Sequence, residues 1–346
     1  MDDMVWFYPN GHEAHHQAGH PERPERIEAI RSAMQQKGWW SAYRQLNPLA
    51  VPAPVLQRIH SPEYLNVLEM SCRRGGHLDA DTYVTPSSWN LALQAAGGAL
   101  AVAEAVWSGS AKRGFALTRP PGHHACHGQG MGFCLLNNIA LAAQALIQEH
   151  GAQRLAIVDL DLHHGNGTQD IFWRRGDVFY LSTHQSPLFP GTGTLDETGA
   201  GEGAGCNANF PLPPGSGDGA LRTVMDDLIL PLLARYQPEM ILISYGFDPH
   251  WSDPLGHLTM SATGIYQAVR KLVTLAEAAC AGRVAVILEG GYNLEAAAAC
   301  SLGVAAALLG QPFADPLGPS PYNESQAWGA MVSKACALWG LSMTNP

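Results

Sequence analysis

The chain has 346 residues, and 46% of them are hydrophobic, which is ample for a large buried core. The formal charge of −10, from 30 acidic and 20 basic side chains, comes without the basic patch that is typical of a nucleic-acid-binding surface. The first residues lack the pattern of a secretory signal, and the apolar stretch at 91–106 is too short to span a bilayer comfortably. We therefore expect neither a nucleic acid nor a membrane as a partner.

The seven cysteines are scattered, and no Cys-x-x-Cys pair occurs. This pattern indicates reduced thiols and a cytoplasmic location, and it gives no support to zinc-finger chemistry. The glycines and prolines fall in short clusters and form no linker or low-complexity segment. We therefore expect one domain over residues 1–346.

Short apolar runs alternate with longer helical patterns along the chain. In chain order, the sequence predicts a helix over residues 89–107, a strand at 114–117, a helix at 137–150, strands at 156–158 and 178–181, a helix at 219–236, a strand at 240–243, a helix at 261–281, a strand at 284–288 and a helix at 294–309. Such alternation is typical of parallel strands joined by crossover helices, and unbroken apolar runs indicate strands buried on both faces. The predicted fold is a single α/β domain with a central parallel sheet flanked by helices.

Polar residues follow each predicted strand. Asp159 comes after the run at 156–158, Asp248 comes after the run at 240–243, and Glu289 follows the run at 284–288. In open α/β sheets the functional crevice lies at the carboxyl ends of the strands. The polar side chains of five distant segments are therefore predicted to meet at one edge of the sheet.

The richest segment is Asp159-Leu160-Asp161-Leu162-His163-His164. If the strand continues through it, the side chains of Asp159, Asp161 and His163 point the same way, and Asp161 and His163 offer an oxygen and a nitrogen ligand side by side. Asp248 is the best candidate for a third ligand, which would leave one position open, as catalytic zinc requires. An isolated Asp-x-His is ordinary strand-end polarity. Two acids and two histidines within six residues favour a metal site, because buried charges need partners.

Two further segments supply candidate catalytic groups. His123 and His124 follow a Pro-Pro-Gly turn, and Tyr292 follows a Gly-Gly pair. Alone, these would be exposed turn histidines and a packed aromatic. Near a metal, the imidazoles become candidates for a general acid and base, because imidazole titrates close to neutral pH.

Taken together, these motifs resemble the histone deacetylase superfamily, which also includes acetylpolyamine amidohydrolases and bacterial deacetylase-like enzymes. The resemblance covers nearly the whole chain in the family's order, through residues 20–27, 60–65, 79–84, 119–124, 131–134, 159–169, 189–193, 244–248 and 289–292. The Arg-Pro-Pro-Gly-His-His form and Asn166 are more similar to the class II branch than to class I.

The resemblance implies an arginase/deacetylase-type fold and a zinc-dependent deacetylase that hydrolyses N-acetyl amides. Zinc would be held by Asp161, His163 and Asp248, and it would polarise the acetyl carbonyl and activate water. The implied catalytic set has His124 as general base, His123 as a mainly electrostatic partner, Tyr292 as oxyanion donor, and Asp159 and Asn166 behind the two histidines.

The resemblance also implies an acyl channel and a structural monovalent cation. The channel and its mouth match Gly132, Phe133, Phe189, Asp81 and Leu255. A potassium or sodium ion would lie at Asp159, Asp161, His163, Ser182 and Thr183, partly on backbone carbonyls.

The substrate stays open among acetyl-lysine in proteins, acetylpolyamines and other small acetylated amines. The segment 70–81 is short, and this disfavours the typical acetylpolyamine amidohydrolase arrangement. A two-manganese, arginase-like hydrolase would need an aspartate where Gly165 stands. A non-catalytic acyl-ligand binding protein is disfavoured by the complete set of site residues.

Two departures from the family pattern concern the surroundings of the pocket. Tyr245 stands where relatives commonly have a small residue, and we expect it to pack behind the sheet. For His250 and Trp251, surface-loop packing and substrate contact are equally open.

Overall fold

The computed structural model describes residues 2–343, and its centre is an eight-stranded sheet in which all the strands are parallel. From one edge to the other the strands are β2 (Arg44–Leu46), β1 (Asp2–Phe7), β5 (Ala111–Ala116), β10 (Val284–Leu288), β9 (Met240–Tyr245), β6 (Leu155–Asp159), β7 (Val178–Gln185) and β8 (Asn207–Leu212). The predicted α/β fold with a central parallel sheet is therefore confirmed. The five predicted strands form its contiguous middle, β5 to β7, and β1, β2 and β8 are additions at its edges.

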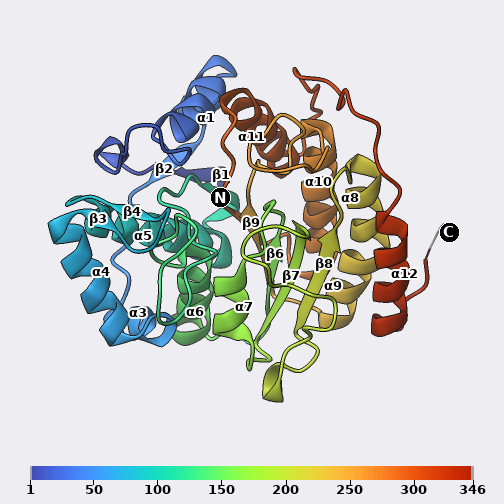
Figure 1. Ribbon diagram of the computed structural model, residues 1–346, viewed down its shortest axis with the longest axis horizontal. Coiled ribbons are helices and arrows are strands. Elements are labelled where there is room, and N and C mark those ends of the chain that lie inside the picture. Colours follow the sequence, from blue (N-terminus) through green and yellow to red (C-terminus); the bar gives the residue numbers. More distant parts are fainter. Residues whose placement is uncertain (1, 344–346) are drawn as a thin grey trace.

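Helices cover both faces of the sheet, as Figure 1 shows. Alternation along the strands divides the core: Ala156 and Val158 of β6 belong to one buried cluster, and Leu155 and Ile157 belong to the other. The first cluster includes side chains from α1 (Glu25–Gln36), α2 (Trp39–Ala42), α8 (Asp218–Val224), α9 (Leu230–Tyr236), α10 (Ala262–Ala279), α11 (Leu294–Leu309) and α12 (Trp328–Trp339). The second includes side chains from α3 (Ala53–Ile59), α4 (Pro62–Arg74), α5 (Ser88–Trp107), α6 (Asn138–His150) and α7 (Asn166–Phe172).

Four of the five predicted helices form close to their expected bounds, as α5, α6, α10 and α11. The expected helix over 219–236 is divided into α8, a π-helical turn at Met225–Ile229 and α9. Pro231 lies in the first turn of α9, and since proline has no backbone N–H it cannot continue a regular α-helical hydrogen-bond ladder. Within residues 2–343, no helix is both long and apolar enough to cross a membrane.

The strand order brings the candidate site together. β6 lies between β9 and β7, and Asp159 at its end pairs in register with Ser244 of β9 and Ser182 of β7. Beyond these strand ends the chain turns into the loops that carry the polar motifs. Tyr245, at the end of β9, is fully buried, and its hydroxyl lies 3.3 Å from Ser301 Oγ of α11. It therefore packs behind the sheet, as expected.

Candidate metal and catalytic site

Asp161, His163 and Asp248 converge although they come from two loops. Each offers one ligand atom, and these three atoms all lie within 4.8 Å of one another. His163 Nδ1 lies 3.3 Å from Asp161 Oδ1 and 3.2 Å from Asp248 Oδ2. The expectation that strand alternation aligns Asp159 with the ligands is wrong, because β6 ends at Asp159. Asp161 and His163 belong to the loop that follows, and Asp159 faces other partners.

Backbone amides and glycines shape this site. Gly290 N donates to Asp161 Oδ2 at 2.9 Å, and Leu162 N donates to Asp248 Oδ1 at 3.1 Å. A methyl group on Gly246 would overlap both carboxylates, so this position must lack a side chain. Two oriented carboxylates and one imidazole form a donor set that fits a divalent cation with an open coordination position.

The ligand set also has the charge balance of a cation site. Burial opposes the charged form of His163, but its hydrogen bonds with Asp161 and Asp248 outweigh burial and raise its pKa to about 9. Burial and the neighbouring charge of Asp161 raise the pKa of Asp248. Two buried carboxylates therefore face one imidazole, and a positive charge between them is favourable.

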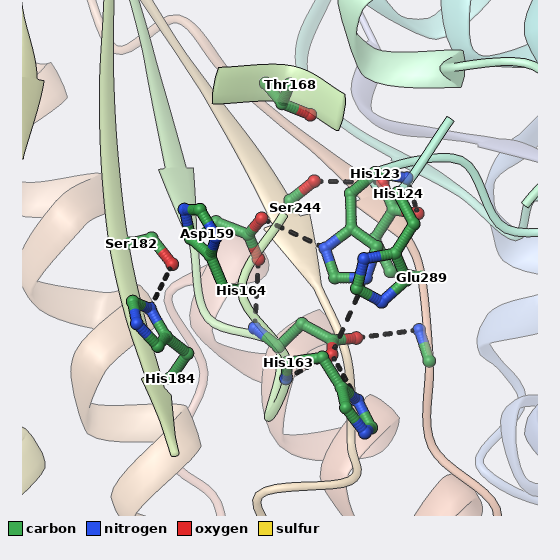
Figure 2. A network of polar contacts seen from close by, with 12 residues as sticks. His123, His124, Asp159, His163, His164, Thr168, Ser182, His184, Ser244 and Glu289 are labelled. Carbon is green, nitrogen blue, oxygen red and sulfur yellow. Dashed lines mark hydrogen bonds and ion pairs between the residues drawn. The ribbon is translucent and has the colours of Figure 1, made fainter. Parts of the chain in front are cut away.

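The two neighbouring histidines have different partners, as Figure 2 shows for His123. His123 Nδ1 lies 3.1 Å from Asp159 Oδ2, which also accepts a hydrogen bond from Tyr180 Oη at 2.9 Å. His124 Nδ1 lies 2.8 Å from Asn166 Oδ1. His123 therefore has a carboxylate behind it, and His124 has a neutral amide.

Because their partners differ, the two imidazole rings differ in pKa although their centroids are only 4.0 Å apart. Burial lowers the pKa of His123, but the charges of Asp161 and Asp159 outweigh it and raise the value to about 10. Burial, with the nearby charges of His123 and His163, holds the pKa of His124 well below its ordinary value. The arrangement therefore favours the charged form of His123 and the neutral form of His124.

Tyr292 and two phenylalanines lie around this centre. The Phe133 ring is 5.7 Å from the Tyr292 ring, and the Phe189 ring is 5.1 Å from that of His124. Gly132 lies close against both His124 and Phe189, since a methyl group there would lie 2.5 Å from His124 Cδ2 and 2.9 Å from Phe189 Cε1. Of the predicted channel residues, Phe133 therefore lies beside Tyr292, and Phe189 lies beside His124.

The two predicted mouth residues lie in loops outside this centre. Asp81 is exposed, and its carbonyl oxygen lies 2.9 Å from His20 Nε2. Leu255 is half-buried and donates its amide to Asp253 Oδ1 at 3.0 Å. Its neighbour Pro254 lines a cavity of about 470 Å³ together with Tyr292. His250 is buried and hydrogen-bonds within its own loop, with Nδ1 2.8 Å from Ser252 Oγ.

Three of the residues predicted for a monovalent cation, Asp159, Ser182 and Thr183, lie side by side on β6 and β7. Thr183 Oγ1 lies 3.5 Å from the carbonyl oxygen of Asp159, and Ser182 is the register partner of Asp159. The Ser182 hydroxyl itself lies 2.9 Å from His184 Nδ1, which Figure 2 also shows.

Several residues support the site in roles that were not predicted from the sequence. Glu289 is fully buried and accepts hydrogen bonds from Gly122 N at 2.7 Å, His123 N at 3.1 Å and Ser244 Oγ at 2.9 Å. Its place directly after a predicted strand was a signal for this role. Tyr180 and Asp253 gave no such signal, because neither directly follows a predicted strand, and their partners are 21 and 39 positions away.

Comparisons with known proteins agree with this geometry. A family model described as "Histone deacetylase domain" matches residues 20–308. The chain is 40% identical to a probable deacetylase of Archaeoglobus fulgidus over 312 residues, covering 89% of this chain and 87% of the relative. It is 37% identical to a histone deacetylase-like amidohydrolase of Pseudomonas aeruginosa, covering 87% and 80%. The crystal structure of the HDA15 HD domain superposes with a TM-score of 0.88 at 33% identity, covering 98% of this chain and 94% of that one.

Proposed function

This chain belongs to the histone deacetylase family, and we propose that it is a zinc-dependent deacetylase that hydrolyses the N-acetyl amide of acetyl-lysine or of a related acetylated amine. The observation that carries the proposal is the convergence of Asp161, His163 and Asp248 within 4.8 Å beside a buried histidine pair. Such a centre is suited to hydrolysing an amide bond that lacks an activated leaving group.

Asp161, His163 and Asp248 would hold the ion. Zinc bound there supplies a Lewis acid for the acetyl carbonyl and lowers the pKa of a water molecule. The loop amides of Gly290 and Leu162 orient the two carboxylates for this task. Hydrogen bonding to ligand side chains of this kind fixes their geometry.

The proton transfers fall to the histidine pair. His124, held neutral, takes a proton from the attacking water at Nε2 and later gives one to the leaving amine, while Asn166 holds Nδ1. His123 stays cationic against Asp159 and stabilises negative charge at the reacting centre. The Tyr292 hydroxyl donates a hydrogen bond to the oxyanion that develops.

The substrate we propose enters as a linear alkyl-amine stem between Phe133 and Phe189, over Gly132. Asp81 and Leu255 would contact it at the mouth. An acetylpolyamine is the alternative substrate. A structural potassium or sodium ion beside β6 and β7, bound by Asp159, Asp161, His163, Ser182 and Thr183, belongs to the same proposal. So does a cytoplasmic location, which is supported by seven unpaired cysteines.

Acetate release from a panel of acetyl-lysine peptides and acetylated polyamines tests the function. We expect hydrolysis by the zinc-loaded protein, loss of activity after chelation, recovery with about one zinc per chain, and a loss of about 10²–10³ in kcat for Tyr292→Phe. Full activity of the metal-free protein would exclude the mechanism. Activity that requires two metal ions per chain would favour the arginase-like alternative.

A further inference from the structure

The loop that follows Asp248 holds the backbone of Tyr292 through one buried carboxylate. Asp253 is 7% exposed, and its Oδ2 accepts hydrogen bonds from Tyr292 N at 2.7 Å and Asn293 N at 3.1 Å. Its other oxygen, Oδ1, accepts from Leu255 N at 3.0 Å. One side chain therefore anchors the tyrosine and the loop that carries Leu255.

A second anchor holds the same turn from the helix that follows it. Asn293 caps α11, and its Oδ1 accepts from Glu295 N and Ala296 N at 2.9 and 3.0 Å. Its Nδ2 donates to the carbonyl oxygen of Ser252 at 3.0 Å. The peptide of Tyr292 therefore lies between a rigid helix start and the Asp253 carboxylate.

All the hydrogen bonds that Asp253 accepts through its carboxylate, among residues 2–343, come from backbone amides. A buried carboxylate without a cationic partner is costly, and burial together with the charge of Asp248 raises the pKa of Asp253 to about 7. The three converging N–H groups act in the opposite direction and favour the carboxylate. An asparagine in this place would turn an N–H group toward at least one of these donors. The carboxylate is therefore suited to orienting this turn in a way that its amide analogue is not.

We propose that Asp253 is a positioning residue, which sets the place of the Tyr292 phenol by fixing the tyrosine's backbone. The consequence for turnover rests on the proposed function, in which that phenol stabilises the oxyanion. A donor displaced by about 1 Å loses much of its effect on the transition state. Because the Asp253 carboxylate also accepts a hydrogen bond from the amide of Leu255, a shift of this carboxylate would displace both the channel mouth and the oxyanion donor.

The test compares Asp253→Asn with Asp315→Asn in the full-length protein. Asp315 is a matched control, since its carboxylate also accepts from three backbone amides, those of Thr263, Leu317 and Gly318, and none of these is a site residue. Amide hydrogen exchange is measured at Tyr292 and Asn293, and kcat and KM are measured for both variants in the wild-type and Tyr292→Phe backgrounds.

We expect Asp253→Asn to accelerate exchange at the Tyr292 and Asn293 amides by about tenfold or more, and Asp315→Asn to leave both rates unchanged. We expect Asp253→Asn to lower kcat by about 10- to 100-fold with KM within about threefold, and to change kcat by less than about threefold in the Tyr292→Phe background.

Unchanged exchange at the two amides would overturn the proposal. So would an equal loss of kcat in both backgrounds, because that result describes a general structural defect. If the wild-type protein cleaved no acetylated amine, the proposed function would fail, and hydrogen exchange alone would decide whether Asp253 anchors the turn.

Discussion

His163 Nδ1 lies 3.2 Å from Asp248 Oδ2, and the same nitrogen lies 3.3 Å from Asp161 Oδ1. With only these groups around it, the pKa of His163 is about 9, because its hydrogen bonds with the two carboxylates outweigh the effect of burial. The two carboxylates that favour a proton on His163 are also the proposed partners of the metal ion. A metal ligand must be deprotonated, so metal and proton compete for His163.

We expect zinc binding at pH 7 to release about one proton, and its affinity to rise about tenfold per pH unit until the pH approaches the pKa of His163. Below that pKa the imidazole is protonated in the metal-free protein, so raising the pH removes the competitor. Chelator competition between pH 6 and 9, with calorimetry in buffers of different ionisation enthalpy, measures both quantities. An affinity that does not change with pH would contradict this account of the ligand set.

Gly246→Ala tests the shape of the same centre. The added methyl group would overlap Asp161 Oδ2 and Asp248 Oδ1, and buried carboxylates held by backbone amides cannot move away cheaply. We expect zinc affinity to fall by about 100-fold or more while the variant still folds, by analogy with the loss of supporting groups around metal ligands.

The control for Gly246→Ala is Gly128→Ala, where a methyl group meets no atom within 4 Å. Zinc content and thermal unfolding are measured for both variants. Wild-type zinc affinity in Gly246→Ala would show that the ligands can rearrange and that close approach at this glycine is dispensable.

The central sheet could be predicted because its strands are buried on both faces and therefore appear as unbroken apolar runs. The edge strand β8 could not, because it carries Asn207 and Asn209 in alternation. Both amides donate to Gln169 Oε1, at 2.9 and 2.8 Å, so the partner that makes burial of these polar residues possible lies in another element. Strand β1 begins with two aspartates and gave no apolar run over its first half.

The site residues also divide into those that the sequence pattern predicts and those that it does not. Its ligands and histidines follow strand ends, where topology alone brings them together. The supporting partners depend on packing between elements. The Glu22–Arg119 ion pair joins residues 97 positions apart, and no local pattern marks such a pair.

Tyr180→Phe tests one of the unpredicted partners. Without the hydroxyl, Asp159 Oδ2 loses a 2.9 Å hydrogen bond and keeps its contact with His123. We expect a stability loss of about 1–2 kcal/mol and a fall in kcat of about tenfold, because Asp159 is less firmly held behind the histidine.

Tyr236→Phe is the matched control for Tyr180→Phe, since its hydroxyl donates to the Gly176 carbonyl at 3.0 Å and contacts no proposed site residue. Urea unfolding and acetate release are measured for both variants. Equal kcat values in the two variants would show that the Tyr180 hydroxyl does not contribute to the catalytic role of His123.

The stability of the fold at acid pH tests the buried ion pairs that Glu22 forms with Arg119 and Arg26. Glu22 is fully buried and contacts Arg119 Nε at 2.7 Å and Arg26 Nη1 at 3.0 Å. Burial opposes its ionisation, but the charges of Arg119 and Arg26 outweigh burial and lower its pKa from 4.5 to about 2. The folded state therefore binds the Glu22 proton less tightly than the unfolded state does. Its stabilisation, about 3 kcal/mol, is complete above pH 4.5 and is lost as the pH falls toward 2.

We expect Glu22→Gln to destabilise the fold at pH 7 by about 3–5 kcal/mol, because two arginines stay buried without their carboxylate. The difference from wild type should shrink as the pH falls from 4.5 to 2, since protonation neutralises the wild-type carboxyl over that range. Urea unfolding at pH 7, 4.5 and 3 measures this, with the exposed neighbour Glu25→Gln as control. A difference that stayed constant down to pH 3 would mean that Glu22 acts by shape and hydrogen bonding alone, and that its charge contributes nothing.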